Sequence, residues 1–222
     1  SITWRCPQSV VKEANRFFTD YSAREDAEEG VVETNAGFLP SAGDLVLCRV
    51  NAPLVSECFS LISEGKAAYV LGREIGYSLE VLIKKVTKDK EVEIEEFLSV
   101  LNDYYRKRMM VLERADKEYQ MQTLTDKYDC IIALSHNTRT VGGLIDNIKE
   151  IFGEKGKKSG VVFSTVHKAK GLEAENVWIL QPEKMPHPMA KTDSAREQEK
   201  NLCYVAITRA MKTLRYVGAR IG

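Results

Sequence analysis

Apolar residues along this chain follow two spacing patterns, one typical of helices and one typical of buried strands. After Pro7, apolar positions follow one another at helical spacing up to Phe18, and proline is favoured at the first position of a helix. A polar stretch that contains glycine follows to about Asp44. Residues 45–50 (LVLCRV) form an unbroken apolar run, which predicts a buried strand leading into a helix over residues 53–64.

Further strands and helices alternate in the rest of the chain, apart from its middle. Short apolar runs predict strands over residues 67–71, 161–165, 177–180 and 214–217, and helical spacing predicts helices over residues 78–86 and 197–211. Strands that alternate with helices favour a parallel sheet. The sequence therefore predicts an α/β fold, in which a mostly parallel sheet carries helices on both faces.

The middle of the chain has a different character. From Ile94 to Tyr119, apolar residues recur three or four positions apart with no glycine or proline among them, which predicts one long amphipathic helix. Shorter helices are expected around residues 126–134 and 141–152. We therefore expect a helical insertion over residues 92–158, between a first part of the α/β domain, residues 1–91, and a second part, residues 159–222.

Composition limits how the chain can contact nucleic acid and where it is located, but it does not indicate a function. The 32 basic and 32 acidic residues cancel, so any contact with nucleic acid has to rely on a local arrangement of donors and cations. The five cysteines are scattered without the spacing of zinc ligands, and we interpret them as reduced core thiols. No apolar run approaches the roughly 20 residues that span a bilayer, and no signal peptide opens the chain, so the expected location is cytoplasmic. The absence of methionine at Ser1 indicates part of a longer protein.

The segment STVHKAKGLEAENVWIL, residues 164–180, carries the first candidate chemistry. Ligands of open α/β sheets bind at the carboxyl ends of strands, where Thr165, His167 and Lys168 are expected. Glu173 follows the turn at Gly171, and we expect it within reach of the same edge. A hydroxyl, an imidazole, lysines and a carboxylate suit hydrogen bonding to a phosphate backbone and a sugar. The alternative is a solvated polar loop between two strands.

Two arginines stand at expected helix ends. In EKNLCYVAITRAMKTL, residues 199–214, Arg209 emerges beside the core at the end of the helix, either as a buried structural ion-pair partner or as a finger on a transferring phosphoryl group. In TWRCPQSVV, residues 3–11, Arg5 directly precedes a helix whose first amides and dipole favour an anion. A solvent-exposed arginine without a ligand is the alternative for Arg5.

These segments, in this order, resemble a known family. TWRCP resembles the arginine-containing motif that opens the second RecA-like motor lobe of UvrD/Rep-like superfamily 1 DNA helicases. In the same family, VVFSTVHKAKGLEAENVWIL resembles the fifth motif and NLCYVAITRA resembles the sixth. LVLCRVNAPL, residues 45–54, resembles the strand and turn that approach single-stranded DNA in that family. The resemblance implies the C-terminal lobe of an ATP-dependent DNA helicase, with the insertion as a reduced accessory arm.

The resemblance also implies a role for each candidate residue. Arg5 and Arg209 are expected to reach the γ-phosphate of ATP. Gly171 and Glu173 are also expected in the nucleotide site, with Glu173 binding the ribose hydroxyls. The residues implied to contact the DNA strand are Arg49, Asn51, Thr165, His167 and Lys168. The form Lys-Gly-Leu-Glu at residues 170–173 is similar to that of the branch translocating 3′ to 5′. The implied partners are single-stranded DNA, its junction with duplex, and the N-terminal RecA-like lobe.

One expected feature of an ATPase is absent from the sequence. No G-x-x-x-x-G-K-[ST] motif occurs, and the nearest lookalike, GEKGKKSG at residues 153–160, precedes a strand and not a helix, so we interpret it as a solvated loop. ATP and its Mg²⁺ are therefore expected to need the other lobe, and this chain alone is not expected to hydrolyse ATP. The alternative function is a helicase-derived module that has lost catalysis and binds DNA or proteins.

The basic run on the long helix and the two tryptophans can each be interpreted as structural or as functional. Residues 106–108 (RKR) on the long helix either touch duplex DNA or belong to the solvent-exposed face of that helix. The second use is the commoner one for such a run. Trp4 and Trp178 lie beside the motifs, where we expect packing in preference to base stacking.

Overall fold

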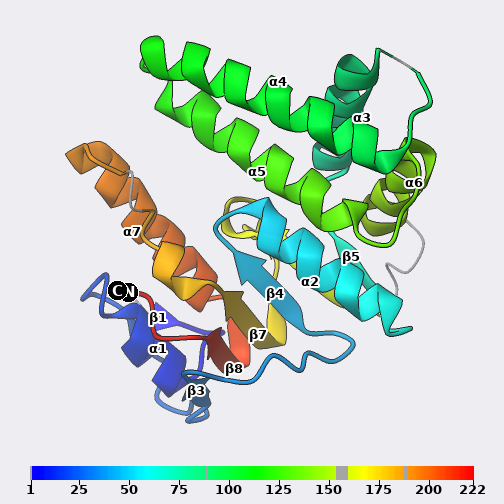
Figure 1. The fold of residues 1–222 in the computed structure, drawn as a ribbon. Helices are drawn as coiled ribbons and strands as arrows, with labels where there is room; N and C mark the ends of the chain where they lie inside the picture. The colour runs from blue at the N-terminus through cyan, green and yellow to red at the C-terminus, as the bar shows by residue number, and fades with distance from the viewer. Residues whose placement is uncertain (1, 89, 154–159, 188–189) are drawn as a thin grey trace. The chain divides into compact units, whose positions relative to one another are not determined.

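The computed structural model describes residues 2–88, 90–153, 160–187 and 190–222 (Figure 1). The chain forms two compact units, one made of Ser1–Arg49 with Gly156–Gly222 and the other of Val50–Lys155. The expected solvated loop at residues 153–160 falls almost entirely on residues 154–159, which lie outside the described residues.

The first unit is built on a parallel sheet. Its strands lie in the order β3 (Val31–Glu33), β8 (Ala210–Val217), β7 (Ala174–Leu180), β4 (Leu45–Cys48) and β6 (Val161–Thr165). Each neighbouring pair in this series is parallel. All four residues of β4 are buried, because a central strand of a parallel sheet is covered on both faces. The predicted α/β fold with a mostly parallel sheet is confirmed.

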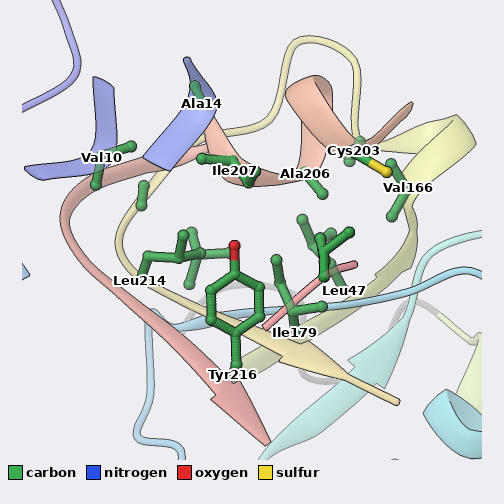
Figure 2. Close-up of a cluster of buried hydrophobic side chains, with 14 of the residues drawn as sticks. Val10, Ala14, Leu47, Val166, Ile179, Cys203, Ala206, Ile207, Leu214 and Tyr216 are labelled. Carbon is green, nitrogen blue, oxygen red and sulfur yellow. The ribbon is translucent and has the colours of Figure 1, made fainter. Parts of the chain in front are cut away.

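Two helices cover one face of this sheet. Apolar side chains of α1 (Gln8–Ala14) and α7 (Asp193–Ile207) meet the inward side chains of the strands, as Figure 2 shows. The largest of these is Tyr216, which is fully buried and whose hydroxyl donates a hydrogen bond to Glu13 Oε1 at 3.1 Å. The cluster includes Val10, Ala14, Leu47, Val166, Ile179, Cys203, Ala206, Ile207 and Leu214.

The alternate residues of the strands face the other side of the sheet, because successive side chains of a strand point to opposite faces. There Trp178 is buried, packs edge-on against Phe38 and donates from Nε1 to Asp44 Oδ2 at 2.9 Å. Trp178 is therefore a packing residue, as expected. Trp4 is 77% exposed and takes no part in this core. All five cysteines are free and buried, which confirms their interpretation as core thiols.

The second unit is mainly helical. It contains α2 (Asn51–Ser63), β5 (Ala68–Val70), α3 (Arg73–Thr87), α4 (Ile94–Arg114), α5 (Glu118–Ser135) and α6 (Val141–Phe152). The last of these has the bounds that the sequence predicts. Between residues 92 and 153 the structure describes these helices and one isolated bridge, Glu93 to Thr140, but no strand. This unit also takes in α2, β5 and α3, so it begins well before residue 92. Where the accessory arm begins stays a prediction.

The single long helix expected from Ile94 to Tyr119 is wrong. Helix α4 ends at Arg114 and α5 begins at Glu118, so Tyr119 lies in the second helix. The chain reverses at Asp116, whose φ is +50°, a left-handed conformation that aspartate tolerates better than most residues. The apolar repeat continues across the break because α4 and α5 pack against each other. No glycine or proline marks the turn.

The last predicted helix also has the wrong end. It was expected over residues 197–211, but α7 ends at Ile207 and β8 begins at Ala210. Arg209 therefore lies in the connection between helix and strand and not on the helix face. The polar stretch before Asp44 hides the short edge strand β3, and β1 (Ile2–Thr3) pairs with β2 (Ser22–Ala23) in a second, small parallel sheet. In the part of the chain that the structure describes, no helix has the length and apolarity needed to cross a membrane.

Candidate functional site

Arg5, Glu173 and Arg209 meet at one end of the sheet. Arg5 Nη1 donates to Glu173 Oε2 at 2.8 Å, and Arg209 Nη1 donates to the carbonyl oxygen of Leu172 at 3.1 Å. The sheet register explains the second contact, since Ala174 of β7 lies opposite Ala210 of β8. The residues that precede these two strands are therefore neighbours. The predicted grouping of these three residues on one edge is found, although the sequence separates them widely.

These residues lie at the amino ends of the strands, whereas the sequence predicts the carboxyl ends. Glu173 and Arg209 precede β7 and β8, so they lie at the amino ends of these strands, whereas Thr165 closes β6 at its carboxyl end. The strands are parallel, and the seven residues of β7 extend about 20 Å at roughly 3.3 Å per residue. The expectation that Glu173 shares an edge with His167 is therefore wrong. The segment between β6 and β7 runs back along the sheet.

The pair of Arg5 and Glu173 is open to solvent. The side chains are 38% and 45% exposed. Partial burial alone would lower the pKa of Arg5, but the hydrogen bonds and charges of Glu173 and Cys6 together outweigh it, and the pKa is raised. An exposed ion pair contributes only about 0–1 kcal/mol to stability, so a ligand can replace it at little cost. Both side chains are therefore available to a bound molecule.

Arg209 is buried and held by the protein. Its Nε donates to Val205 O at 3.0 Å, and its Nη2 donates to Thr208 Oγ1 at 3.3 Å. With the bond to Leu172, three of the five N–H donors of a guanidinium are engaged. None of these partners is a carboxylate, and burial together with the nearby charge of Arg5 lowers the pKa of Arg209. The two arginines and the one carboxylate leave a local excess of positive charge, which suits an anion.

The anion site expected at the start of the first helix is wrong. Helix α1 begins at Gln8 and follows Pro7 as its cap. The backbone amides of Gln8 and Ser9 already donate to the carbonyl oxygens of Glu28 and Glu29, at 3.0 and 2.9 Å. These are the donors that a helix start would offer to an anion. Arg5 therefore lies beside Glu173 and not above a free helix terminus.

A second group lies at the carboxyl ends of β4 and β6. Cys48 and Thr165 are opposite each other in the register, so Arg49 and His167, which follow them, are placed on the same edge. Arg49 makes a bidentate pair with Glu199 of α7, with distances of 2.7 and 3.1 Å. The side chains are 17% and 7% exposed. Four of the five residues implied to contact DNA belong to this edge: Arg49, Thr165, His167 and Lys168.

Glu199 is the centre of this second group. Its Oε2 also accepts a hydrogen bond from the backbone amide of His187 at 2.8 Å. Burial alone would raise the pKa of Glu199, but the bonds from Arg49 and from the His187 amide outweigh it and lower the pKa. Arg49 is thus held in place by a buried, ionised carboxylate.

Solvent exposure differs among the three residues that follow or close β6, which are Thr165, His167 and Lys168. Thr165 is only 6% exposed, whereas His167 and Lys168 are open to solvent on one side. Partial burial, followed by the charge of Arg49, lowers the pKa of His167, and partial burial lowers the pKa of Lys168. The imidazole is therefore more easily kept neutral than a free one. Gly171, with φ of +89°, makes the turn that follows, where a side chain would be strained although space is open.

Asn51 lies in the second unit, at the start of α2. Asp126 of α5 accepts three hydrogen bonds there, from the backbone amides of Asn51 and Ala52 at 2.8 and 3.0 Å and from Asn51 Nδ2 at 2.6 Å. The carboxylate thus caps α2 and fixes the Asn51 side chain. Asn51 Oδ1 is buried without a hydrogen-bond partner. Asp126 is a residue that the sequence reasoning missed.

The sequence also gives no prediction for Glu199, although it opens the segment in which Arg209 is a candidate residue. A signal was present, because Glu199 stands four positions before Cys203 on the apolar face of α7, where a charge requires a partner. No comparable signal marks Asp126 in its polar surroundings. Among the residues that the structure describes, no three histidine, cysteine or acidic side chains gather as a metal site would require.

Comparison with known proteins gives a family. The sequence profile of the UvrD-like helicase C-terminal domain matches residues 54–218. The ATP-dependent DNA helicase PcrA of Staphylococcus aureus is 26% identical over 214 residues, which cover 87% of this chain and 26% of that protein. The PcrA of Bacillus subtilis is 30% identical over 131 residues, or 58% of this chain and 15% of its own length. This chain therefore spans about a quarter of the length of the curated relatives it matches most fully.

One solved structure also aligns with this chain along most of its length. It is the C-terminal domain of a possible DNA helicase from Lactobacillus plantarum WCFS1, which is 16% identical and matches 98% of this chain and 89% of its own. The TM-score is 0.29, so the two chains superpose poorly as wholes.

Proposed function

Because this chain belongs to the UvrD-like helicase C-terminal domain family, we propose that it is the second motor lobe of an ATP-dependent DNA helicase or translocase. The observation that carries the proposal is the cluster of Arg5, Glu173 and Arg209. A buried arginine without a carboxylate partner and an exposed arginine beside it form a site for a polyphosphate. The lobe that carries the phosphate-binding loop would complete it.

In this proposal the nucleotide lies at the amino ends of β7 and β8. Arg209 is preorganised by its bonds to the protein and directs its two remaining N–H donors at the γ-phosphoryl oxygens, where charge develops during hydrolysis. Arg5 leaves its exposed pair with Glu173 to join it, and Glu173 is then released to accept from the ribose hydroxyls. The missing lobe supplies the cradle for ATP and the ligands for Mg²⁺.

The DNA strand is proposed to pass the other edge of the sheet, at the carboxyl ends of β4 and β6. His167 and Lys168 are exposed there, and Arg49 stands beside them. Thr165 completes the proposed contacts at this edge, mainly with phosphates and sugars. Asn51, in the second unit, is proposed as a separate contact with DNA. The direction of movement, 3′ to 5′, is proposed from the Lys-Gly-Leu-Glu form of residues 170–173. Unwinding of duplexes with a 3′ or a 5′ tail tests it.

The deciding experiment uses a protein that joins this chain to its phosphate-binding lobe. Arg209→Ala should reduce DNA-stimulated ATPase by about 10³-fold or more, since an arginine finger is worth roughly 10³ to 10⁵ in rate. Binding of single-stranded DNA should change less than twofold, because Arg209 lies at the other edge. Arg196→Ala, an exposed arginine on α7, is the matched control and should keep full turnover.

A structural role for Arg209 is the rival, because its three bonds to the protein would hold the connection between α7 and β8 without any ligand. In that case Arg209→Ala lowers the free energy of unfolding and leaves the turnover of the folded fraction unchanged. That result would favour a binding module without catalysis over the motor lobe.

A further inference from the structure

The second unit contains a hollow that the proposed motor function does not use. It lies between α3, α4 and α5 and has a volume of about 320 Å³, at the lower end of the range of small-ligand pockets. Each helix lines it with one stripe, because residues three or four positions apart share a helix face. The lining residues are Ser78, Val81, Leu82, Lys85, Tyr104, Arg108, Leu112, Tyr119, Gln120, Thr123, Leu124 and Lys127. We refer to it as the three-helix hollow.

The floor of the three-helix hollow is aliphatic. Among its apolar lining residues, Leu82 and Leu112 are buried, whereas Val81 is 46% exposed and Tyr119 is 80% exposed. Exposed apolar side chains that gather at a concavity, unlike single ones scattered over a surface, mark a place where another apolar group is bound. The floor therefore suits one apolar side chain of a ligand.

The rim of the three-helix hollow is basic. Each helix contributes one cation, Lys85 from α3, Arg108 from α4 and Lys127 from α5, and no lining residue is acidic. In the part of the chain that the structure describes, no carboxylate forms an ion pair with any of the three. The Lys85 ammonium lies 5.4 Å from the centre of the Tyr104 ring, which holds it beside the opening. In a chain whose charges cancel as a whole, this is a local excess of positive charge.

An aliphatic floor within a ring of three cations fits a particular ligand chemistry. Carboxylates that flank an apolar side chain would meet the cations while that side chain enters the hollow. A nucleic-acid strand fits less well, because its phosphates gain nothing from the aliphatic floor and the Tyr104 ring already holds Lys85. We propose that the three-helix hollow is a docking site for a short acidic peptide segment of a partner protein, anchored by one large apolar residue.

The test measures binding to the 222-residue chain, so it does not depend on the proposed motor function. The probe is a fluorescein-labelled heptapeptide, Glu-Asp-Glu-Leu-Phe-Asp-Glu, with related peptides that carry Trp or Met in place of Phe. One control peptide has lysine at every acidic position, and another has serine in place of Leu-Phe. Fluorescence anisotropy at two salt concentrations gives the affinity of each. We expect the acidic peptides with an apolar centre to bind, and neither control to do so.

Charge reversal at the rim locates the site. Arg108→Glu and Lys127→Glu should each weaken binding of the acidic peptide about tenfold or more, because a like charge then faces the ligand. Val81→Asp should do the same through the floor. Lys107→Glu, on α4 but outside the lining, is the matched control and should change binding less than twofold. Circular dichroism establishes that each variant is folded.

Two outcomes would overturn the proposal. One is that no acidic peptide of the set binds, or that all bind equally to the wild type and to Arg108→Glu. The other is that a twelve-nucleotide single strand binds in place of the peptides and is lost in Arg108→Glu and Lys127→Glu but not in Lys107→Glu. The hollow would then be a nucleic-acid site.

Discussion

Arg5 and Arg209 belong to one cluster but are held in opposite ways. Arg209 is buried among carbonyl oxygens and a hydroxyl, whereas Arg5 reaches a carboxylate across an exposed gap. A guanidinium fixed by neutral acceptors keeps its geometry before a ligand arrives, and one in an exposed pair can move to meet it. The proposed site thus combines a preorganised arginine with an adaptable one.

The two histidines of the carboxyl edge predict a pH dependence. Partial burial and the charge of Arg49 lower the pKa of both His167 and His187 from the ordinary value of 6.5, despite the opposing charge of Glu199. The unfolded chain then binds more protons than the folded one below pH 6.5, so the contribution of these residues is present above that pH and is lost as pH falls towards the folded pKa values. The free energy of unfolding should therefore decrease from pH 7 to pH 5.5.

Urea unfolding at a series of pH values measures this decrease. The double variant His167→Gln with His187→Gln should flatten it, while His136→Gln, outside this edge, should leave it unchanged. An equally steep decrease in the double variant would show that other groups cause it.

At the scale of residues, the sequence predicts which side chains gather but not what holds them. The motifs single out Arg49 and Asn51, yet their partners Glu199 and Asp126 come from segments 150 and 75 positions away. Such partners are chosen by tertiary packing, which no local pattern records. Only the charge of Glu199 on an apolar helix face gives a hint.

Among the elements, α2 depends on a carboxylate supplied by α5. Asp126 satisfies two backbone amides at the start of α2, a place normally served by the cap residue itself, which here is Val50 with no polar side chain. The helix start and the Asn51 side chain are therefore fixed together. A change at Asp126 should affect both stability and any contact that Asn51 makes.

Asp126→Ala should lower the free energy of unfolding by about 1–2 kcal/mol, the usual cost of losing a helix cap. In the protein with both lobes it should also weaken binding of single-stranded DNA, because Asn51 loses the partner of its amide. Urea unfolding and a DNA titration measure the two effects. Asp103→Ala, exposed on α4, is the control for a lost carboxylate and should change neither. Loss of stability without loss of DNA affinity would remove Asn51 from the proposed contacts.

The elements that the sequence predicts best are those with a clear period and a marked end. Helix α6 is capped by Thr140, whose side chain accepts from Gly143 N, and its apolar stripe is complete, so its bounds are predicted correctly. The turn between α4 and α5 has no such mark, since Asp116 adopts a positive φ without a glycine. The short strand β3 is not predicted because three residues are too few to show an alternation of apolar and polar positions.

In the first unit as a whole, Glu199 ties three segments together. It joins α7 to Arg49 after β4 and to the backbone amide of His187. Removal of one member of a buried pair leaves the other charge without compensation, which costs about 3–5 kcal/mol when both are fully buried. Because Arg49 retains 17% exposure, the cost should be lower.

Glu199→Ala should therefore lower the free energy of unfolding by about 2–3 kcal/mol, a discounted form of the buried-pair cost. Arg49→Met with Glu199→Leu, which removes both charges, should restore most of it. Glu197→Ala, exposed on the same helix, should cost less than about 0.5 kcal/mol. Urea unfolding provides all three values. A cost for Glu199→Ala no larger than that of Glu197→Ala would show that the pair is not buried in solution.

The α/β class follows from the sequence because strands and helices alternate along most of it. The placement of the site at two edges does not follow, since it depends on which end of each strand a residue adjoins after the chain has folded. Glu173 is only six positions beyond His167, yet the run between β6 and β7 carries it to the start of the next strand. Distance along the chain misled the prediction there.

The strand β7 has a mechanical consequence. It is hydrogen-bonded to β4 on one side and to β8 on the other, so neither edge is free to slide or bend. A strand that is hydrogen-bonded on both sides bends less easily than one with a free edge. In the proposed motor, a displacement of Glu173 at one end of β7 would therefore be shared by β4 and β8 and would not bend β7 alone. The proposed motor would therefore transmit movement through the sheet as a unit and not through the stretching of a single strand.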